Sequence, residues 1–483
     1  MILQTLLKNI EVCAMSASPD MEITGVSYDS RTTKPGDLFV AVSGFATDGH
    51  RFIPMAIERG AAAILCEHDM PEGTPWIQVK SARKTLALLG GNWYGHPSEA
   101  MQMIGVTGTN GKTSVTCLVK TLIEETLGGK VGLIGTIRNQ IGEEVLETER
   151  TTPESFELQG LLAKMRDAGC THVVMEVSSH ALALNRVDGI TFTVGAFTNL
   201  TEDHLDFHVT MEEYRLAKSR LFSMCKRGVF NLDDEAAQKM IADANCEILT
   251  VATEKDADIC AKEVELTSDH IEMNALYNGE STKVHIGIPG YFTVSNGLVA
   301  MGIAHALEIP MEEAAEALKK AKGVKGRIEV VPTPGKEYTV LIDYAHTPDG
   351  LENVLRSVRE FCKGRLIVVF GCGGDRDRTK RPIMGRIALE YADFAIVTSD
   401  NPRTEAPMAI INDILCGMKD IKKPYVVEED RRRAIRVALR CGRKHDIIVL
   451  AGKGHETYQI LGTEKTHLDE REEVASALWE MRK

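Results

Sequence analysis

The chain has 483 residues and a formal net charge of −13, with 43% hydrophobic and 26% charged residues. That length exceeds what one hydrophobic core usually supports, so several domains are expected, and the composition is typical of a globular protein. An acidic chain repels polyanions, which argues against a nucleic-acid partner, and no apolar run is long enough to span a bilayer.

The 11 cysteines are scattered singly, without a C-x-x-C pair. This pattern indicates neither a disulfide framework nor a zinc site, and favours reduced, mostly buried thiols in a cytosol. The first residues lack a basic leader and a small-residue cleavage site, so no signal peptide is expected. A cytoplasmic location is therefore predicted.

Two stretches of the chain show strand–helix alternation. Short strands are expected at 38–42 and 62–65, between turn-rich segments. Further along, the expected strands are 103–106, 131–134, 172–177 and 193–198, with a helix over 113–127. A second set of strands is expected at 340–342, 366–370, 394–398 and 447–450. Such alternation predicts parallel sheets covered by helices, with ligands at the carboxyl ends of the strands.

The predicted fold class is therefore α/β with three domains. The expected boundaries give a mixed α/β domain at 1–98, a parallel-sheet domain at 99–331 and a doubly wound domain at 332–483.

The strongest local motif is GVTGTNGKT, residues 105–113, which follows an expected strand and opens an expected helix. Its glycines let backbone N–H groups turn toward phosphate oxygens, and the helix N-terminus adds partial positive charge. Lys112 would reach the outer phosphates, and the Thr113 hydroxyl would bind Mg²⁺. The strict P-loop pattern has a glycine where this chain has Val106. The motif predicts an ATP-binding loop, and an ordinary glycine turn before a helix is the alternative.

A P-loop needs a carboxylate near its metal, usually at the end of a neighbouring strand. Glu176 ends the apolar run HVVME and could supply it. Alone, Glu176 fits equally well as a polar strand terminus, whereas beside the phosphate loop the metal role is favoured.

Many segments of the chain resemble the Mur ligases of bacterial cell-wall synthesis, along essentially its whole length. Within that family the chain is most similar to the ligases that add the third residue of the peptide stem. The segments are YDSR (28–31), GDLFVAV (36–42), TGTNGKT (107–113), TTPES (151–155), MEVSSHAL (175–182), FTNLTEDHLDFH (197–208), YRLAKSRLF (214–222), GRIE (326–329), DYAHTPD (343–349), FGCGGDRD (370–377), DNPRTE (400–405) and AGKGHE (451–456). The resemblance implies a UDP-sugar domain, a central P-loop ATPase domain and a Rossmann-like C-terminal domain.

The resemblance implies an ADP-forming amide ligase that uses ATP and Mg²⁺. It would add meso-2,6-diaminopimelate to the D-glutamate of UDP-N-acetylmuramoyl-L-alanyl-D-glutamate, and a monomer is expected. ATP would phosphorylate the substrate carboxylate, and the incoming amine would then displace phosphate. Phosphorylation removes the charge that makes a carboxylate a poor electrophile, and cations must screen the two anions while they react.

The same resemblance assigns the catalytic and metal-binding residues. Thr113 and Glu176 would hold one Mg²⁺, and a second would lie among Glu176, His204 and Lys218 as a carbamate. Lys112 completes the expected catalytic set. From the residues alone, Lys218 fits a solvated helix lysine and His204 an ordinary loop histidine.

The remaining ATP contacts implied by the resemblance lie in the loop and beyond it. They are Gly108, Thr109, Asn110, Gly111, Lys112, Thr113, Ser114, Asn296, Arg327, Asp343 and His346. Thr293 stands where many relatives carry an additional asparagine. Arg327 lies near a domain boundary, so an ATP ligand there would couple domain closure to catalysis.

Hydroxyl groups and one arginine dominate the expected UDP-substrate contacts, and these suit diphosphate and uracil oxygens. The residues are Ser30, Phe45, Ala46, Thr47, Thr151, Thr152, Ser178 and Arg186. Ser30 could equally be a turn residue, and Leu184 replaces a glutamine with which some relatives contact this substrate.

The donor amino acid is expected to bind at Asp400-Asn401-Pro402-Arg403, which follows an expected strand. In the family, DNPR accompanies meso-diaminopimelate, and lysine-adding relatives differ at the arginine. Diaminopimelate is lysine with an extra carboxylate, which Arg403 can bind bidentately. The other expected contacts are Arg376, Gly452 and Glu456, of which Glu456 can pair with the distal ammonium. In isolation, Asn-Pro would indicate a solvated turn.

Three alternatives remain open at this point. A related amide ligase, such as folylpolyglutamate synthase or the ligase that adds D-Ala-D-Ala, would share TGTNGKT but is not expected to carry DNPR with AGKGHE. A P-loop switch without ligase activity leaves the first and third domains unexplained. An inactive scaffold is disfavoured because the expected catalytic residues are all intact.

Overall fold

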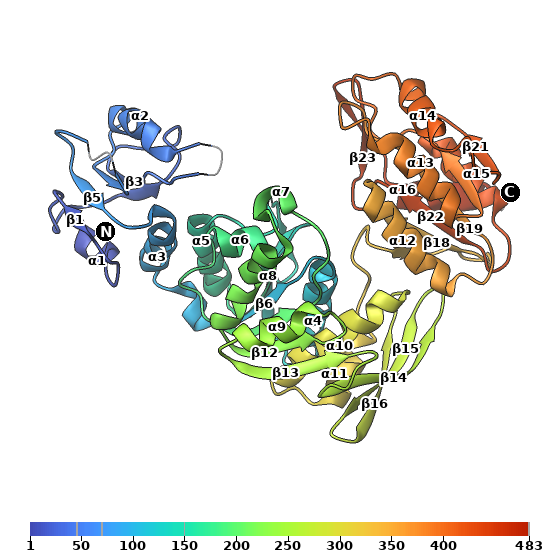
Figure 1. The fold of residues 1–483 in the computed structure, drawn as a ribbon, viewed down its shortest axis with the longest axis horizontal. Coiled ribbons are helices and arrows are strands. Elements are labelled where there is room, and N and C mark those ends of the chain that lie inside the picture. Colours follow the sequence, from blue (N-terminus) through green and yellow to red (C-terminus); the bar gives the residue numbers. More distant parts are fainter. Residues whose placement is uncertain (45–46, 69–70, 149, 482–483) are drawn as a thin grey trace. The chain divides into compact units, whose positions relative to one another are not determined.

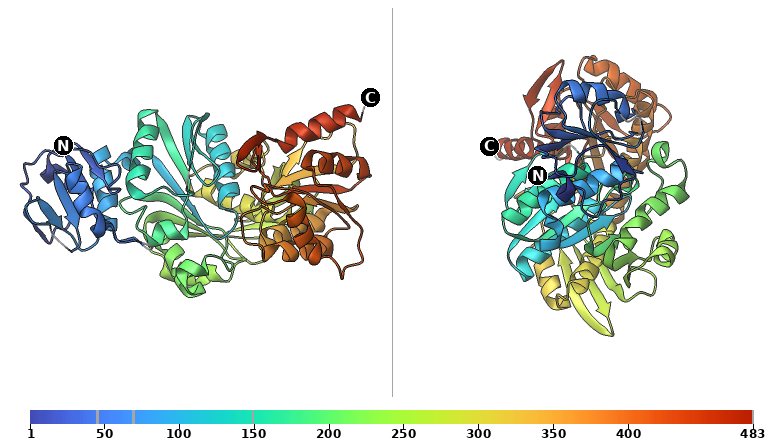
Figure 2. Two further views of the ribbon diagram at one scale, coloured as in Figure 1. Left: turned by 90° about the horizontal axis from the view of Figure 1, so that it is seen from above. Right: turned by 90° about the vertical axis from the view of Figure 1, so that its left-hand side faces the viewer.

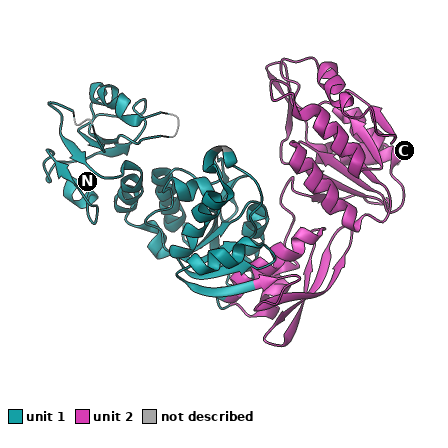
Figure 3. Ribbon diagram, in the orientation of Figure 1, with its two compact units in different colours: residues 1–250, 306–308 teal, residues 251–305, 309–483 magenta. Residues whose placement is uncertain are grey.

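The computed structural model describes residues 1–44, 47–68, 71–148 and 150–481 (Figure 1). The chain forms two compact units, one of residues 1–250 and 306–308, the other of residues 251–305 and 309–483 (Figure 3). Both units are mixed α/β with parallel sheets, so the expected fold class is confirmed. The three-domain boundaries at 98 and 331 stay a prediction. Phe45 and Ala46 lie outside the described residues.

The first unit begins with a five-stranded sheet of order β1-β5-β4-β3-β2, parallel except at β1. Its strands are β1 (Ala14–Met15), β2 (Gly25–Ser27), β3 (Asp37–Val40), β4 (Ala63–Cys66) and β5 (Trp76–Gln78), and its helices are α1 (Leu3–Leu6), η1 (Gly49–Phe52), α2 (Ile53–Glu58), α3 (Ala82–Tyr94) and η2 (Pro97–Ala100). Every residue of β3 and β4 is buried, which is why continuous apolar runs predicted both strands.

The larger sheet of the first unit has the order β13-β12-β11-β6-β10-β7-β8-β9. Its strands are β6 (Gln102–Thr107), β7 (Lys130–Ile134), β8 (Asn139–Ile141), β9 (Glu144–Leu146), β10 (Cys170–Glu176), β11 (Phe192–Phe197), β12 (Cys225–Asn231) and β13 (Glu247–Ala252). Its helices are α4 (Lys112–Thr126), α5 (Ser155–Asp167), α6 (Ser179–Ala183), α7 (Leu205–His208), α8 (Met211–Ser219), η3 (Arg220–Ser223) and α9 (Ala236–Asp243). Because β6 is parallel to both β10 and β11, the carboxyl ends of these three strands meet at one edge.

The second unit begins with an antiparallel set of strands, β14 (Ile259–Leu266), β15 (Ile271–Tyr277) and β16 (Glu280–Ile286). Two helices follow them in the chain, α10 (Tyr291–Ala306) and α11 (Met311–Leu318). None of these strands was expected from the sequence. Their segments alternate between buried and exposed residues and carry many charges, which gives a weaker signal than a continuous apolar run.

The C-terminal sheet of the second unit has the order β17-β18-β22-β19-β20-β21, parallel except at β17. Its strands are β17 (Glu329–Val331), β18 (Thr339–Asp343), β19 (Leu366–Phe370), β20 (Phe394–Val397), β21 (Tyr425–Val427) and β22 (Ile447–Ala451), and a hairpin of β23 (Tyr458–Leu461) and β24 (Glu464–His467) follows. Residues of α12 (Pro348–Phe361), α13 (Lys380–Tyr391) and α14 (Pro407–Cys416) pack in one core, and those of α15 (Arg431–Cys441) and α16 (Glu470–Glu480) in another. Helices therefore cover both faces of this sheet (Figure 2).

None of the helices in the described part of the chain is both long and apolar enough to cross a membrane.

Candidate active site

The phosphate loop lies where β6 ends and α4 begins. Gly108 has φ +149°, and a Cβ there would lie 1.9 Å from Thr198 Oγ1, so the loop admits only glycine at this position. Gly111 precedes α4 with φ +84°. Val106 is fully buried within β6 and pairs with both neighbouring strands, so it belongs to the sheet and not to the loop. Its departure from the strict motif therefore leaves the loop itself intact.

Two lysines converge on a single carbonyl of this loop. Lys112 Nζ and Lys218 Nζ each donate to Gly108 O at 2.8 Å, and Lys112 also donates to Thr109 O at 2.8 Å. The Lys218 side chain is only 1% exposed. Burial, and then repulsion from Lys112, holds the pKa of Lys218 well below its usual range.

Glu176 lies at the end of β10, directly beside the phosphate loop. Its Oε1 accepts hydrogen bonds from Thr113 Oγ1 at 2.9 Å and from Thr136 N at 2.8 Å, and its Oε2 accepts from Thr136 Oγ1 at 3.0 Å. Thr136 Oγ1 in turn lies 3.0 Å from Thr151 Oγ1. The fold thus gathers a buried carboxylate and three hydroxyl groups, which are the hard oxygen donors that Mg²⁺ prefers.

His204 belongs to an aromatic cluster with His180 and Tyr214. It has φ +53° and immediately precedes α7, and its Nε2 lies 3.4 Å from Asp203 Oδ2. Its ring centroid lies 6.2 Å from that of Tyr214, and Lys218 Nζ lies 4.4 Å from the same Tyr214 ring. Tyr214 therefore packs against both His204 and Lys218.

Three of the expected UDP-substrate residues lie close to Glu176. Thr152 Oγ1 donates to Glu176 O at 2.8 Å and accepts from Ser178 N at 3.2 Å. Arg186 donates to Thr152 O at 3.1 Å and pairs with Glu154 at 2.7 Å. Within the described residues, Arg186 Nε is buried without a hydrogen-bond partner, so one donor of this guanidinium is left for a ligand.

The N-terminal candidates for this substrate have contacts of their own. Ser30 is buried and its hydroxyl donates to Met55 Sδ at 3.3 Å, and Thr47 is exposed. Leu184 ends α6.

In the second unit, three of the expected ATP residues surround Tyr344. The Arg327 guanidinium lies 5.6 Å from the Tyr344 ring centroid, and His346 Nδ1 lies 2.8 Å from Tyr344 O. Asp343 is buried at the end of β18 and accepts from the backbone N–H groups of Ile328 and Ala345 at 2.8 Å each. Burial raises the pKa of Asp343.

Asn296 is buried within α10. The nearby Thr293 donates its hydroxyl to Pro289 O at 3.2 Å, so it serves the local backbone.

The carboxyl ends of β20 and β22 form a second polar centre in this unit. Lys453 is fully buried, and its Nζ lies 2.5 Å from Asn401 Oδ1, 3.2 Å from Asp400 Oδ1 and 3.1 Å from Glu456 Oε2. Burial acts to raise the pKa of Asp400, but Lys453 and Arg431 outweigh it, and the pKa is lowered. The ammonium group of Lys453 therefore contacts three of the residues that are expected to bind the donor amino acid.

Arg403 begins the loop that borders this centre. It has φ +54°, and its NH1 donates to Gly374 O at 2.8 Å. Gly452 has φ +117°, and a Cβ there would lie 2.7 Å from Asp400 Oδ2. Pro402 is buried, and the exposed Arg376 donates to Asp375 O at 3.2 Å.

Family models match three successive parts of the chain. They are described as the Mur ligase family, catalytic domain (residues 22–94), the Mur ligase middle domain (106–304) and the Mur ligase, glutamate ligase domain (326–454). The chain is also 47% identical, over the full length of both chains, to the UDP-N-acetylmuramoyl-L-alanyl-D-glutamate–2,6-diaminopimelate ligase of Caldanaerobacter subterraneus.

The chain belongs to the Mur ligase family. It is likewise 46% identical, with 100% of both chains covered, to the ligase of the same name from Clostridium tetani. A solved structure of a UDP-N-acetylmuramoyl-L-alanyl-D-glutamate–2,6-diaminopimelate ligase shares its fold with a TM-score of 0.78 at 32% identity, covering 100% of this chain and 99% of that one.

Several residues that shape this Mur ligase site were not expected from the sequence. Thr136 comes from a segment far from the phosphate loop, and only the fold brings it to Glu176. Tyr214 lies four residues before Lys218 on α8, so helical spacing offered a signal for their contact. Lys453 lies inside the AGKGHE segment, so its position offered a signal.

Arg381 was also missed, and its segment carries no motif that points to it. It is fully buried and pairs with Glu405 at 2.7 Å and with Asp413 at 2.9 Å, which ties the segment after Arg403 to α13. The hydrogen bonds from Arg381 lower the pKa of Glu405 to about 2.

Proposed function

We propose that this Mur ligase adds meso-2,6-diaminopimelate to the D-glutamate of UDP-N-acetylmuramoyl-L-alanyl-D-glutamate at the expense of ATP. The observation that carries the proposal is the centre at the ends of β20 and β22, where Arg403 lies beside Asp400, Asn401 and Glu456. The names of the relatives that match over the full chain support the same reaction.

The residues around Glu176 fit a magnesium ion. Glu176 would bind it with Thr113, because a buried carboxylate and a hydroxyl at 2.9 Å offer oxygen ligands within reach of the phosphate loop. When bound, the ion would screen the negative charges that must approach each other. Thr136 holds the carboxylate orientation through both its backbone N–H and its hydroxyl.

Lys112 and Lys218 take different roles in this proposal. Lys112, at the N-terminus of α4, would bind the outer phosphates of ATP together with the loop N–H groups. Lys218 would act as a carbamate, because its lowered pKa favours the neutral amine that combines with carbon dioxide. The carbamate would place an anion beside Glu176 and His204, and Tyr214 would hold it in place.

Arg186, Thr152 and Ser178 would bind the UDP-linked substrate on the other side of Glu176. The unpaired Nε of Arg186 and the neighbouring hydroxyl groups suit phosphate and carbonyl oxygens. This arrangement would hold the D-glutamate carboxylate near the phosphate loop, where proximity replaces a bimolecular encounter.

Arg403 would select the amino acid by its distal carboxylate. Lysine lacks that carboxylate and would leave the guanidinium without a partner. A site built for a charged group can reject the analogue lacking it by a factor on the order of 10⁴. Glu456 would pair with the distal ammonium.

The proposed reaction can be tested by measuring the mass of the product that the protein forms. The full-length protein is incubated with ATP, Mg²⁺, the UDP-muramoyl dipeptide and either meso-diaminopimelate or lysine, and products are identified by mass spectrometry. We expect one diaminopimelate to be added per ADP released, and little product with lysine. Arg403→Ala should abolish diaminopimelate turnover while leaving nucleotide binding unchanged.

Arg378→Ala is the matched control, because Arg378 is an exposed arginine near the same loop that pairs with Asp413. It should turn over diaminopimelate normally. Equal turnover of both amino acids by the wild type, or unchanged kinetics in Arg403→Ala, would contradict the proposed specificity.

A further inference from the structure

Two histidines and a glutamate cluster on the antiparallel strands of the second unit, in a region that the proposed reaction does not use. Glu272 on β15 and His285 on β16 are directly opposite each other in the strand register. His270 lies in the turn that leads into β15 and precedes Ile271, which pairs with Ile286. The sheet therefore fixes the three side chains relative to one another.

The distances within this cluster suit a single small cation. One ligand atom from each of the three residues lies within 4.8 Å of the other two. The two imidazole centroids are 4.7 Å apart with planes inclined by 33°. Ligands at the usual 2.0–2.1 Å from zinc stand roughly 3.3 Å apart in a tetrahedron, so small side-chain rotations would close the site.

His270 is oriented as metal-binding histidines commonly are. Its Nδ1 lies 2.8 Å from Asp269 Oδ1 and 2.9 Å from Thr267 Oγ1. Because Nδ1 faces Asp269 and Thr267, Nε2 is the ring nitrogen that would bind the ion. A carboxylate behind a histidine ligand fixes its tautomer and increases its basicity.

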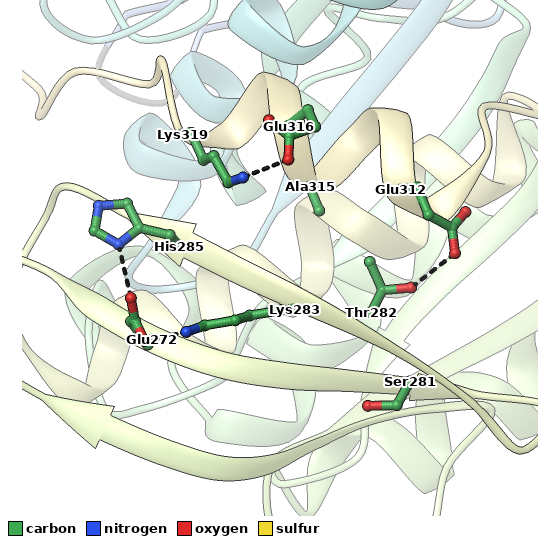
Figure 4. Close-up of a pocket in the computed structure, with 9 residues that line it drawn as sticks. All are labelled: Glu272, Ser281, Thr282, Lys283, His285, Glu312, Ala315, Glu316 and Lys319. Atoms are coloured by element: carbon green, nitrogen blue, oxygen red, sulfur yellow. Dashed lines mark hydrogen bonds and ion pairs between the residues drawn. The ribbon is translucent and has the colours of Figure 1, made fainter.

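The cluster borders an open pocket of about 520 Å³ beside α11 (Figure 4). Glu272 and His285 point toward each other at this pocket, with His285 Nδ1 3.5 Å from Glu272 Oε1. Lys283 Nζ lies 2.7 Å from Glu272 Oε2, the other carboxylate oxygen. Oε1 therefore faces His285, and the pocket gives a solvated ion a path of entry.

We propose that His270, Glu272 and His285 form a binding site for one divalent transition-metal ion of the zinc class. Two imidazoles and one carboxylate favour Zn²⁺, Co²⁺ or Ni²⁺ over Mg²⁺ and Ca²⁺, which prefer oxygen ligands only. Three protein ligands leave a coordination position for water or an anion in the pocket. The bound ion would connect β15, β16 and the preceding turn.

A second cluster of similar composition fits an ion less well. Asp48, His50 and His68 also have ligand atoms within 4.8 Å of one another. However, His50 Nε2 accepts from Glu67 N at 2.9 Å, and His50 Nδ1 lies 2.7 Å from Asp48 Oδ1. Both ring nitrogens of the buried His50 are committed, so an ion would have to break a hydrogen bond in the N-terminal core.

Cobalt binding tests the proposal. The full-length protein is dialysed against a chelator, titrated with Co²⁺, and followed by the visible absorption of the bound ion and by equilibrium dialysis with Zn²⁺. We expect one equivalent that His270→Ala and His285→Ala each lose. His467→Ala is the matched control, because His467 also pairs with a carboxylate, Glu472 at 2.6 Å, but belongs to no such cluster among the residues that the structure describes.

Two further variants make the test sharper. Asp269→Asn should weaken Zn²⁺ binding by about 10–100-fold, the usual effect of losing such a carboxylate. Lys283→Met should leave Zn²⁺ binding equal or stronger, because it frees Glu272 of a competing cation.

Zn²⁺ should also raise the melting temperature of the wild type but not of His285→Ala. Equal metal stoichiometry in the wild type and both histidine variants, with all of them folded by circular dichroism, would overturn the proposal.

Discussion

At the scale of single residues, the site depends on lysines placed where lysine is costly. Lys218 and Lys453 are almost fully buried, and each is held by a different kind of partner. Lys218 is buried close to Lys112, and burial and then this repulsion lower its pKa. Lys453 lies within 3.2 Å of oxygens of Asp400, Asn401 and Glu456. In the proposed reaction, one buried lysine would thus take part in the chemistry and the other would position the donor-site residues.

Removing Lys218 should abolish ligase activity and leave the fold intact. We expect Lys218→Ala to lose at least about 100-fold in kcat, on the scale of losing one electrostatic contact to the transition state. Formate or acetate should restore part of the activity, because a small carboxylate can occupy the space of the carbamate. Lys226→Ala, which removes an exposed lysine on β12, should retain full activity. Steady-state rates with and without added carboxylate check this, and activity of Lys218→Ala near the wild-type level would rule out the carbamate role.

Removing Lys453 should cost stability and should make the protein more sensitive to acid. Breaking a buried ion pair from one side typically costs about 3–5 kcal/mol, and Lys453→Met would leave Asp400 and Glu456 without their shared cation. In the wild type, the lowered pKa of Asp400 stabilises the fold above its unfolded value of 3.8, and this contribution is lost as the pH falls toward the folded pKa. Without Lys453 the pKa of Asp400 rises, so acid unfolding should begin at higher pH.

The control for this prediction is Lys465→Met, which removes an exposed lysine stacked on Tyr458 in the adjacent hairpin. Circular dichroism during an acid titration of the three proteins measures the midpoints. Coincident midpoints for the wild type and Lys453→Met would show that Lys453 does not stabilise Asp400. In Lys453→Met that remains folded at neutral pH, the KM for the donor amino acid should rise more than kcat falls.

At the scale of elements, the sequence predicted the strands that are continuous apolar runs and the loop that carries a glycine motif. Apolar runs gave β6, β10, β18 and β22, and the glycines of residues 105–113 gave the loop that joins β6 to α4. The strands β15 and β16 were not expected, because buried apolar residues alternate there with polar residues and form no continuous apolar run. Contacts such as Thr136 with Glu176 depend on strand order, which no local pattern contains.

Gly108, in the loop before α4, and Gly128, just after α4, both have positive φ and can be compared directly. At Gly108 an added Cβ would lie 1.9 Å from Thr198 Oγ1, whereas at Gly128, beyond the C-terminal end of α4, it would meet nothing within 4 Å. Gly128→Ala should therefore cost only backbone strain, about 1–2 kcal/mol. Gly108→Ala should cost more and should abolish nucleotide binding. Urea denaturation and calorimetric titration with ATP measure both effects, and equal losses in the two variants would contradict this account of the loop.

At the scale of the whole molecule, the proposed substrate roles are divided between the two units. Thr152, Ser178 and Arg186 belong to the first unit, and Arg403 and Glu456 belong to the second. Each group is held by hydrogen bonds within its own unit. Variants at Arg403 should therefore alter donor binding without altering the binding of the UDP-linked substrate, and calorimetric titration of each ligand separately can measure that independence.

The cysteines give a prediction that involves the whole chain. All eleven are free thiols in the described structure, and Cys13 and Cys416 are the two that are exposed. Burial raises the pKa of Cys117 to about 11 and that of Cys372 to about 12, which suppresses the reactive thiolate. Ellman's reagent at pH 8 should therefore label two thiols quickly in the native protein, and all eleven after unfolding in guanidinium without a reductant. The double variant Cys13→Ser, Cys416→Ser should show no fast phase, whereas fewer than eleven thiols in the unfolded wild type would reveal a disulfide that this fold does not contain.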